Sequence, residues 1–153
     1  MNRVSKRLVK IFTMLAVLSA LAVSAFAQEM QNKMDDKMMM KDSKPTVVIV
    51  RANWCPACQK IEPFMKELMN EYADRLNFVV LDVTDENTSK TAQTTAEKHG
   101  LGKFFAANKS KTSTIAIFDA KHKVVFKTDH NYEREAYVKA FDNAIEMGKM
   151  MKG

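Results

Sequence analysis

The stretch TVVIVRANWCPACQK, residues 46–60, decides the fold. It opens with a β-branched run, which predicts a strand over residues 46–52 that is buried on both faces of a parallel sheet. The strand leads to the only two cysteines of the chain, Cys55 and Cys58, and an amphipathic segment follows them. Two cysteines separated by two residues at a strand-to-helix turn indicate a redox-active dithiol.

The segment after the cysteines is predicted to be a long helix that extends to about residue 73. Its apolar face consists of Ile61, Phe64, Met65, Leu68, Met69 and Tyr72. A second buried strand is predicted at residues 78–81. A weakly helical, Thr-rich stretch at residues 88–99 is ended by Gly100. This order implies a right-handed crossover between two parallel strands.

The second half of the domain is predicted to begin with an irregular connection over residues 101–113. Two short strands at residues 114–118 and 124–127 follow, with the spacing of a hairpin. A last helix is expected over residues 133–147, and its apolar face is made of Tyr137, Phe141, Ala144 and Ile145. The predicted order is βαβαββα, an α/β fold with a mixed sheet flanked by helices.

The first 27 residues have the pattern of a secretory signal peptide. A basic start is followed by an apolar run at residues 11–23 and by small residues that end at Ala27. We expect cleavage after Ala27 and export to the periplasm or the medium. An uncleaved signal anchor, which would attach the protein to a membrane, is the alternative.

The predicted mature chain divides into an arm and one domain. Residues 28–44 contain charge and methionine but no branched aliphatic or aromatic residue, which predicts a flexible arm. Residues 45–153 are enough for a single domain, expected to be a monomer. The formal charge of +6 falls to about +2 without the four basic residues of the signal. Nothing in this balance indicates a nucleic-acid partner.

The order of elements, with Trp54-Cys55-Pro-Ala-Cys58 at the first helix, resembles the thioredoxin fold from about residue 46 to 145. Pro63 lies eight residues after Cys55, where thioredoxins have a proline in the same helix. Residues 96–101 are similar to the family segment that precedes the substrate loop. The resemblance implies a thioredoxin-like domain and a thiol-disulfide oxidoreductase that needs neither a bound cofactor nor a metal.

The dithiol has a predicted division of roles. The unpaired N–H groups and the dipole at a helix N-terminus favour an anion, so the Cys55 thiolate should be stabilised and should act as the nucleophile. Cys58, one helical turn on and expected to be more buried, then resolves the mixed disulfide with a client protein. The expected partners are client thiols or disulfides and a further redox protein.

Four other residues are expected to contact the client. Trp54 would form an apolar platform beside the nucleophile, with ordinary packing at the strand end as the alternative. Pro56 lies near the first helical position, where proline is well tolerated. Thr112 and Ser113 precede the predicted third strand, at the place where the family has its substrate loop.

The sequence also departs from the family. Ser113 stands where thioredoxins have a cis-proline, and a cis bond before serine costs about 2.5 to 4 kcal/mol, so we expect a trans loop. Ile49 occupies the position of a buried acid, and Val80 that of a buried lysine. The Cys58 proton must therefore move through water or another residue, which favours a specialised or weak exchanger.

Other functions stay open at this point. The cysteine pair alone also fits half of a zinc site or a structural bridge. Thioethers and thiolates suit Cu(I), so a copper-handling protein is a second hypothesis. The methionines concerned are Met30, Met34, Met38, Met39 and Met40 in the arm and Met147, Met150 and Met151 at the C-terminal end. A non-catalytic binding module on a thioredoxin scaffold is the third.

Overall fold

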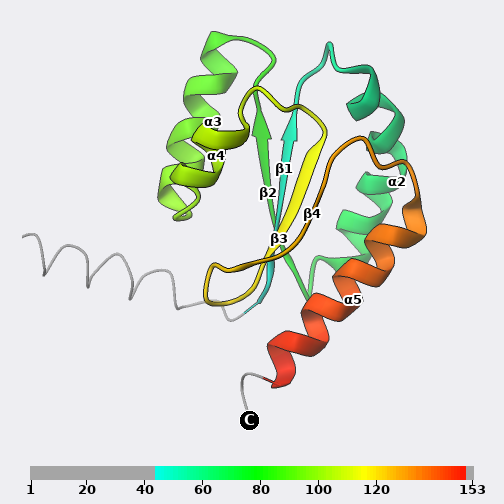
Figure 1. Ribbon diagram of the computed structural model, residues 1–153. Helices are drawn as coiled ribbons and strands as arrows, with labels where there is room; N and C mark the ends of the chain where they lie inside the picture. Colours follow the sequence, from blue (N-terminus) through cyan, green and yellow to red (C-terminus); the bar gives the residue numbers. More distant parts are fainter. Residues whose placement is uncertain (1–43, 151–153) are drawn as a thin grey trace, which may run out of the picture. The chain divides into compact units, whose positions relative to one another are not determined.

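A computed structural model describes residues 44–150, which form a four-stranded sheet with helices on both faces (Figure 1). The predicted signal peptide, and the arm apart from Lys44, lie outside the described residues. The strands are β1 (Thr46–Arg51), β2 (Asn77–Asp82), β3 (Thr114–Phe118) and β4 (Val124–Thr128), in the order β2-β1-β3-β4. β1 is parallel to β2 and antiparallel to β3, and β3 is antiparallel to β4. The predicted mixed sheet is confirmed.

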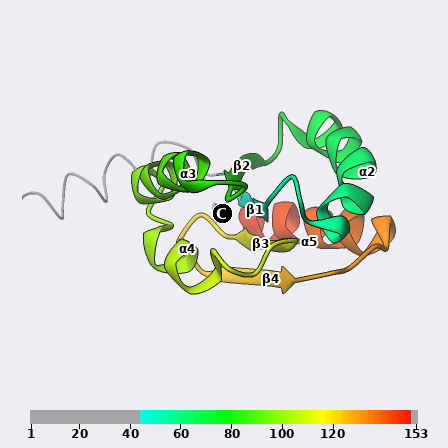
Figure 2. The same cartoon turned by 90° about the horizontal axis from the view of Figure 1, so that it is seen from above.

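The helices form one layer on each face of the sheet (Figure 2). They are α2 (Pro56–Tyr72), α3 (Glu86–Lys98), α4 (Gly102–Asn108) and α5 (Arg134–Met150). α2 and α5 cover one face, and α3 and α4 cover the other. Among the described helices, none is both long enough and apolar enough to cross a membrane.

The sheet alternates its side chains between two cores. Val47 and Ile49 of β1 pack with α2 and α5, whereas Val48 and Val50 pack with α3 and α4. All four are buried, and full burial of one such side chain stabilises the fold by about 1.5 to 3 kcal/mol. The prediction of a strand buried on both faces is confirmed for β1.

Two sequence predictions for this part of the chain are wrong. Residues 101–113 are not irregular throughout, because α4 forms there and changes the order to βαβααββα. Leu101 and Phe105, one helical turn apart, are buried beside the sheet and stabilise this short helix. β2 is an edge strand within the described sheet, so its burial is incomplete and Val80 is 41% exposed.

Aromatic packing fixes the last helix against the sheet. The ring of Phe141 is fully buried and meets Tyr72 and Phe78 edge-on, with centroids 5.2 and 5.8 Å apart. Tyr137 is also buried, and its hydroxyl donates a hydrogen bond to the carbonyl oxygen of Asn131 at 2.7 Å. This bond ties the loop after β4 to α5.

Replacement of Phe141 by alanine should destabilise the protein by about 3 to 5 kcal/mol, because it leaves a cavity where three aromatic rings meet. Urea unfolding followed by circular dichroism measures this change. Val124→Ala, at a position of β4 that is 43% exposed, is the control and should change the free energy of unfolding much less, by about 0.5 kcal/mol. Equal losses for the two variants would contradict the packing of Phe141, on α5, against α2 and β2.

The buried hydroxyl of Tyr137 should make the fold less stable in alkaline solution. Burial, with a smaller contribution from Tyr132, raises the pKa of Tyr137 from 10.0 to about 12. Below pH 10 the hydroxyl is protonated whether the chain is folded or unfolded. Between about pH 10 and 12 the unfolded chain loses this proton first, so the free energy of unfolding falls by up to about 1.4 kcal/mol per pH unit.

Urea titrations at stepped pH measure this dependence. Tyr137→Phe should show a shallower fall than the wild type, although Tyr72 remains. Burial and a hydrogen bond to Asp142 also raise the pKa of Tyr72. A fall as steep in Tyr137→Phe as in the wild type would assign the alkaline loss to other groups.

Candidate active site

The cysteine turn leaves the sheet at the end of β1 and caps α2. The N–H group of Cys55 donates to the carbonyl oxygen of Ala52 at 3.2 Å, and Pro56 is the first residue of the helix. Cys55 is the N-cap residue, and its sulfur accepts a hydrogen bond from the N–H group of Cys58 at 3.1 Å. The predicted position of the pair at a strand-to-helix turn is confirmed.

Cys55 and Cys58 form a disulfide, with their Cα atoms 5.3 Å apart. This separation lies in the ordinary range for a disulfide. Cys55 is 3% and Cys58 is 6% exposed, so the expectation that Cys58 is the more buried of the two is wrong for the disulfide form. The two cysteines form a small buried cluster with Ala52, directly after β1, and Ala57, in the first turn of α2.

A polar network holds the turn in place. The Arg51 guanidinium donates to the Asp82 carboxylate and to the side-chain oxygen of Asn53, each at 2.8 Å. Thr84 donates to Asp82 through its backbone N–H at 2.8 Å and its hydroxyl at 2.5 Å. The Trp54 indole N–H donates to the Thr84 carbonyl oxygen at 3.0 Å. The ends of β1 and β2 are therefore joined to Trp54, the residue before Cys55.

Sequence reasoning missed this network, although one signal was available. Arg51 and Asp82 end two neighbouring parallel strands and lie opposite each other in the register. Opposite charges at such positions indicate an ion pair. The pattern of one strand alone does not show it.

Trp54 is 62% exposed, although its indole N–H group is bound to the Thr84 carbonyl oxygen. Pro56 is also exposed, on the other side of Cys55 in the sequence. These two side chains present apolar surface next to a disulfide whose own atoms are largely covered.

Ser113 lies directly before β3, where the sequence predicts the substrate loop, and shares a pocket with Cys58. Ser113 is buried, and its N–H group donates to the carbonyl oxygen of Val50 at 2.8 Å. Its hydroxyl accepts from the N–H group of His130 at 3.2 Å. Thr112, the neighbouring predicted residue, is partly buried, and no hydrogen bond joins its side chain to the cysteine turn.

The described residues contain no cis peptide bond, in agreement with the expected trans loop. The φ angle of Ser113 is 65°, in the left-handed region that residues other than glycine seldom adopt. Sequence reasoning missed this conformation. The hydrogen bonds of Ser113 to β1 and to the loop after β4 hold it there.

A pocket of about 240 Å³ lies behind Cys58, between α2 and the sheet. Ile49 and Val80 lie opposite each other in the register and both line it, so these strand positions contribute no acid and no lysine. The remaining lining residues are Val50, Arg51, Cys58, Ile61, Glu62, Met65, Lys66, Met69, Ser113 and Ile115. The pocket is thus apolar except for Ser113 and three charged side chains.

Glu62 is the only carboxylate among these lining residues, and sequence reasoning missed it. Its two oxygens lie 2.7 Å from the Lys66 ammonium and 3.4 Å from the Arg51 guanidinium. The hydrogen bond from Lys66 holds the pKa of the Glu62 carboxyl below its ordinary value. The charges of Lys66 and Arg51 act in the same direction, and desolvation opposes them. The signal in the sequence that could have identified Glu62 is its spacing of four residues from Cys58.

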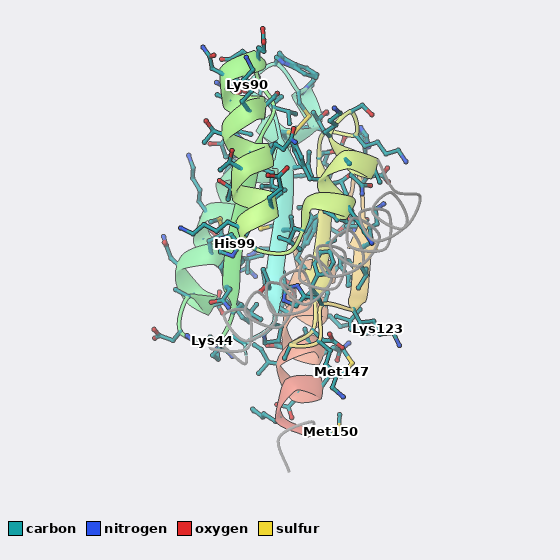
Figure 3. The ribbon with its side chains drawn as sticks, turned by 90° about the vertical axis from the view of Figure 1, so that its left-hand side faces the viewer. Lys44, Lys90, His99, Lys123, Met147 and Met150 are labelled. Atoms are coloured by element: carbon teal, nitrogen blue, oxygen red, sulfur yellow. A yellow bond between two sulfur atoms is a disulfide. The ribbon has the colours of Figure 1, made fainter. Side chains whose placement is uncertain are left out.

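Those residues of the metal hypotheses that lie within the described part of the chain are dispersed. His99 lies at the end of α3 (Figure 3), His122 in the β3–β4 turn and His130 after β4. Within residues 44–150, no three His, Cys, Asp or Glu side chains form a group that could hold a metal. Met147 and Met150 lie at the end of α5 (Figure 3), near the start of β1, whereas the cysteines follow its other end. Met151 and the methionines of the arm lie outside the described residues.

Comparison with known proteins gives consistent matches. The thioredoxin of Acidithiobacillus ferridurans is 40% identical over 55 residues, which cover 36% of this chain and 50% of that protein. The chloroplastic thioredoxin M-type of Pisum sativum is 30% identical over 116 residues, which cover 68% of this chain and 64% of that protein. The chain thus spans half the length of the first relative and slightly less than two thirds of the second.

A solved structure shows the same fold. The solution structure of a thioredoxin-like protein in the oxidized form matches with a TM-score of 0.51 and 17% identity, over 69% of this chain and 80% of that chain. The family model described as Thioredoxin matches residues 25–128, more than half of the sequence. Because that match includes β1, the cysteine turn and α2, the chain belongs to the thioredoxin family.

Proposed function

We propose that this protein exchanges thiols and disulfides with client proteins outside the cytoplasm, through Cys55 and Cys58. The observation that carries the proposal is the disulfide at the N-terminus of α2, where the N–H group of Cys58 points at the Cys55 sulfur at 3.1 Å. The same donor and the helix dipole stabilise the thiolate that remains after reduction. The predicted signal peptide supports the location.

The reduction of a client would proceed in two balanced steps. The Cys55 thiolate attacks one sulfur of the client disulfide, forms a mixed disulfide and displaces the other client sulfur as a thiolate, which takes a proton from solvent. Cys58 then loses its proton and attacks Cys55, which releases the second client thiolate. The client gains two electrons, and Cys55–Cys58 becomes a disulfide. The reverse sequence oxidises a client dithiol.

The surface around the disulfide supports a protein client rather than a buried small molecule. Trp54 and Pro56 are exposed next to Cys55, and Thr112 and Ser113 directly precede β3. Exposed aromatic surface next to a buried reactive group suits an extended peptide that carries its own cysteine. The direction of the exchange depends on the reduction potential of the cysteine pair and on the redox protein that reduces or oxidises it again.

Residues 28–153 should show a reversible two-electron transition in thiol/disulfide buffers. Trp54 is the only tryptophan of the chain and adjoins Cys55, so its fluorescence should follow the transition. A midpoint near about −270 mV would indicate a reductase and one near about −120 mV an oxidant. Cys55→Ser is the control and should show no transition. A wild-type protein without a reversible transition would contradict the proposed function.

The roles of the two cysteines can be separated by trapping. Cys58→Ser should accumulate mixed disulfides between Cys55 and client proteins, because the resolving thiol is missing. Cys55→Ser should accumulate none. Nonreducing electrophoresis with mass spectrometry of the bridged peptides measures both results. Equal trapping by the two variants, or trapping only through Cys58, would contradict the assignment.

A further inference from the structure

The resolving step of the proposed exchange needs a group that removes the proton from Cys58. Cys58 is a thiol while Cys55 is bound to the client, and a thiol must become a thiolate before it attacks. Ile49 and Val80 contribute no ionisable group to the pocket behind it. We propose that Glu62 is the acid–base group of Cys58. This inference rests on the proposed function.

The geometry of α2 brings the two side chains together. Glu62 follows Cys58 by four residues in this helix, and side chains at that spacing lie on one face with Cβ atoms about 5–6 Å apart. Both line the same pocket, whose other walls are mainly aliphatic and thioether side chains. The Glu62 carboxylate can therefore reach the Cys58 sulfur directly or through one water molecule.

The charges around Glu62 keep it ionised and oriented. Lys66 on the same helix and Arg51 on β1 both contact its carboxylate, and Asp82 on β2 pairs with the other side of Arg51. His130, after β4, donates a hydrogen bond from its backbone N–H group to the Ser113 hydroxyl on the pocket wall. The carboxylate side chain is 35% exposed, so a proton that it accepts can pass to solvent.

The resulting step is balanced. The Glu62 carboxylate takes the proton of the Cys58 thiol, and the new thiolate attacks the Cys55 sulfur. The Cys55–Cys58 bond forms as the bond between Cys55 and the client sulfur breaks, and the electron pair leaves with the client thiolate. Glu62 then gives its proton to that thiolate or to water. In the reverse direction Glu62 protonates the Cys58 thiolate when the disulfide opens.

The test uses the reduced protein and oxidised glutathione as the client. Stopped-flow Trp54 fluorescence and acid quenching with mass spectrometry separate the attack by Cys55 from the resolution by Cys58. In Glu62→Gln the resolution rate at pH 7 should fall about tenfold or more, because a general base is lost. Between about pH 5 and 8 it should rise tenfold per pH unit, whereas the wild-type rate should change little. The attack step, measured in a Cys58→Ser background, should be unaffected.

The matched control is Glu67→Gln, which removes the same charge from an exposed position of α2. It should keep the wild-type pH profile, and an equal loss in this variant would overturn the proposal in favour of a net-charge effect. An unchanged profile in Glu62→Gln would overturn it outright. If the wild type forms no mixed disulfide with glutathione and shows no redox transition, the proposed exchange fails as well.

A second variant separates proton transfer from a structural role. Glu62→Ala opens space beside Cys58 for a small carboxylate, so added formate should restore part of the resolution rate in proportion to its concentration. Chloride at the same ionic strength should not. Slow resolution that formate fails to restore would assign Glu62 a structural role and overturn the proposal.

Discussion

The burial of β1 between two layers of helices is the constraint on which the rest of the structure depends. Val47 and Ile49 belong to one core, and Val48 and Val50 belong to the other. A shift of the strand by one residue would exchange these faces and disturb both cores at once. The register is therefore strongly specified, and it fixes where the chain leaves the sheet and where Cys55 begins the first turn of α2.

The same register also places the charges of the site. It sets Arg51 opposite Asp82 at the end of two parallel strands, and from there hydrogen bonds lead through Thr84 to Trp54. On the other side Arg51 reaches Glu62. One guanidinium thus connects the sheet, the loop before Cys55 and α2. The electrostatics of the pocket are supplied from α2 and the end of β1 rather than from the middle of the strands.

The parts of the fold that repeat a local pattern could be predicted from the sequence. The β-branched run at residues 46–50 and the apolar face of α2 are periodic, and the cysteines mark the turn between them. The other features depend on partners distant in sequence. α4 is only seven residues long and is stabilised by burial of Leu101 and Phe105 against the sheet. Val80 is exposed because β2 is at the edge of the described sheet, which periodicity does not show.

The loop at Ser113 and the pocket behind Cys58 belong to this second group. The left-handed conformation of Ser113 is held by hydrogen bonds to Val50 and to His130. No local rule assigns such a conformation to serine. The sequence shows that Glu62 follows Cys58 by four positions, but this spacing alone assigns Glu62 no role. The role proposed for it depends on Ile49 and Val80, which line the same pocket and carry no charge.

The disulfide closes a ring of only four residues, Cys55 to Cys58. In the chain-entropy description, such a short loop restricts the unfolded state little and contributes about 2 kcal/mol to stability. The two apolar cores do not depend on that bond. Opening or closing the disulfide therefore changes the chemistry of the surface while the protein stays folded. The proposed exchange can therefore take place on a scaffold that stays folded, unlike small secreted domains whose disulfides hold the fold together.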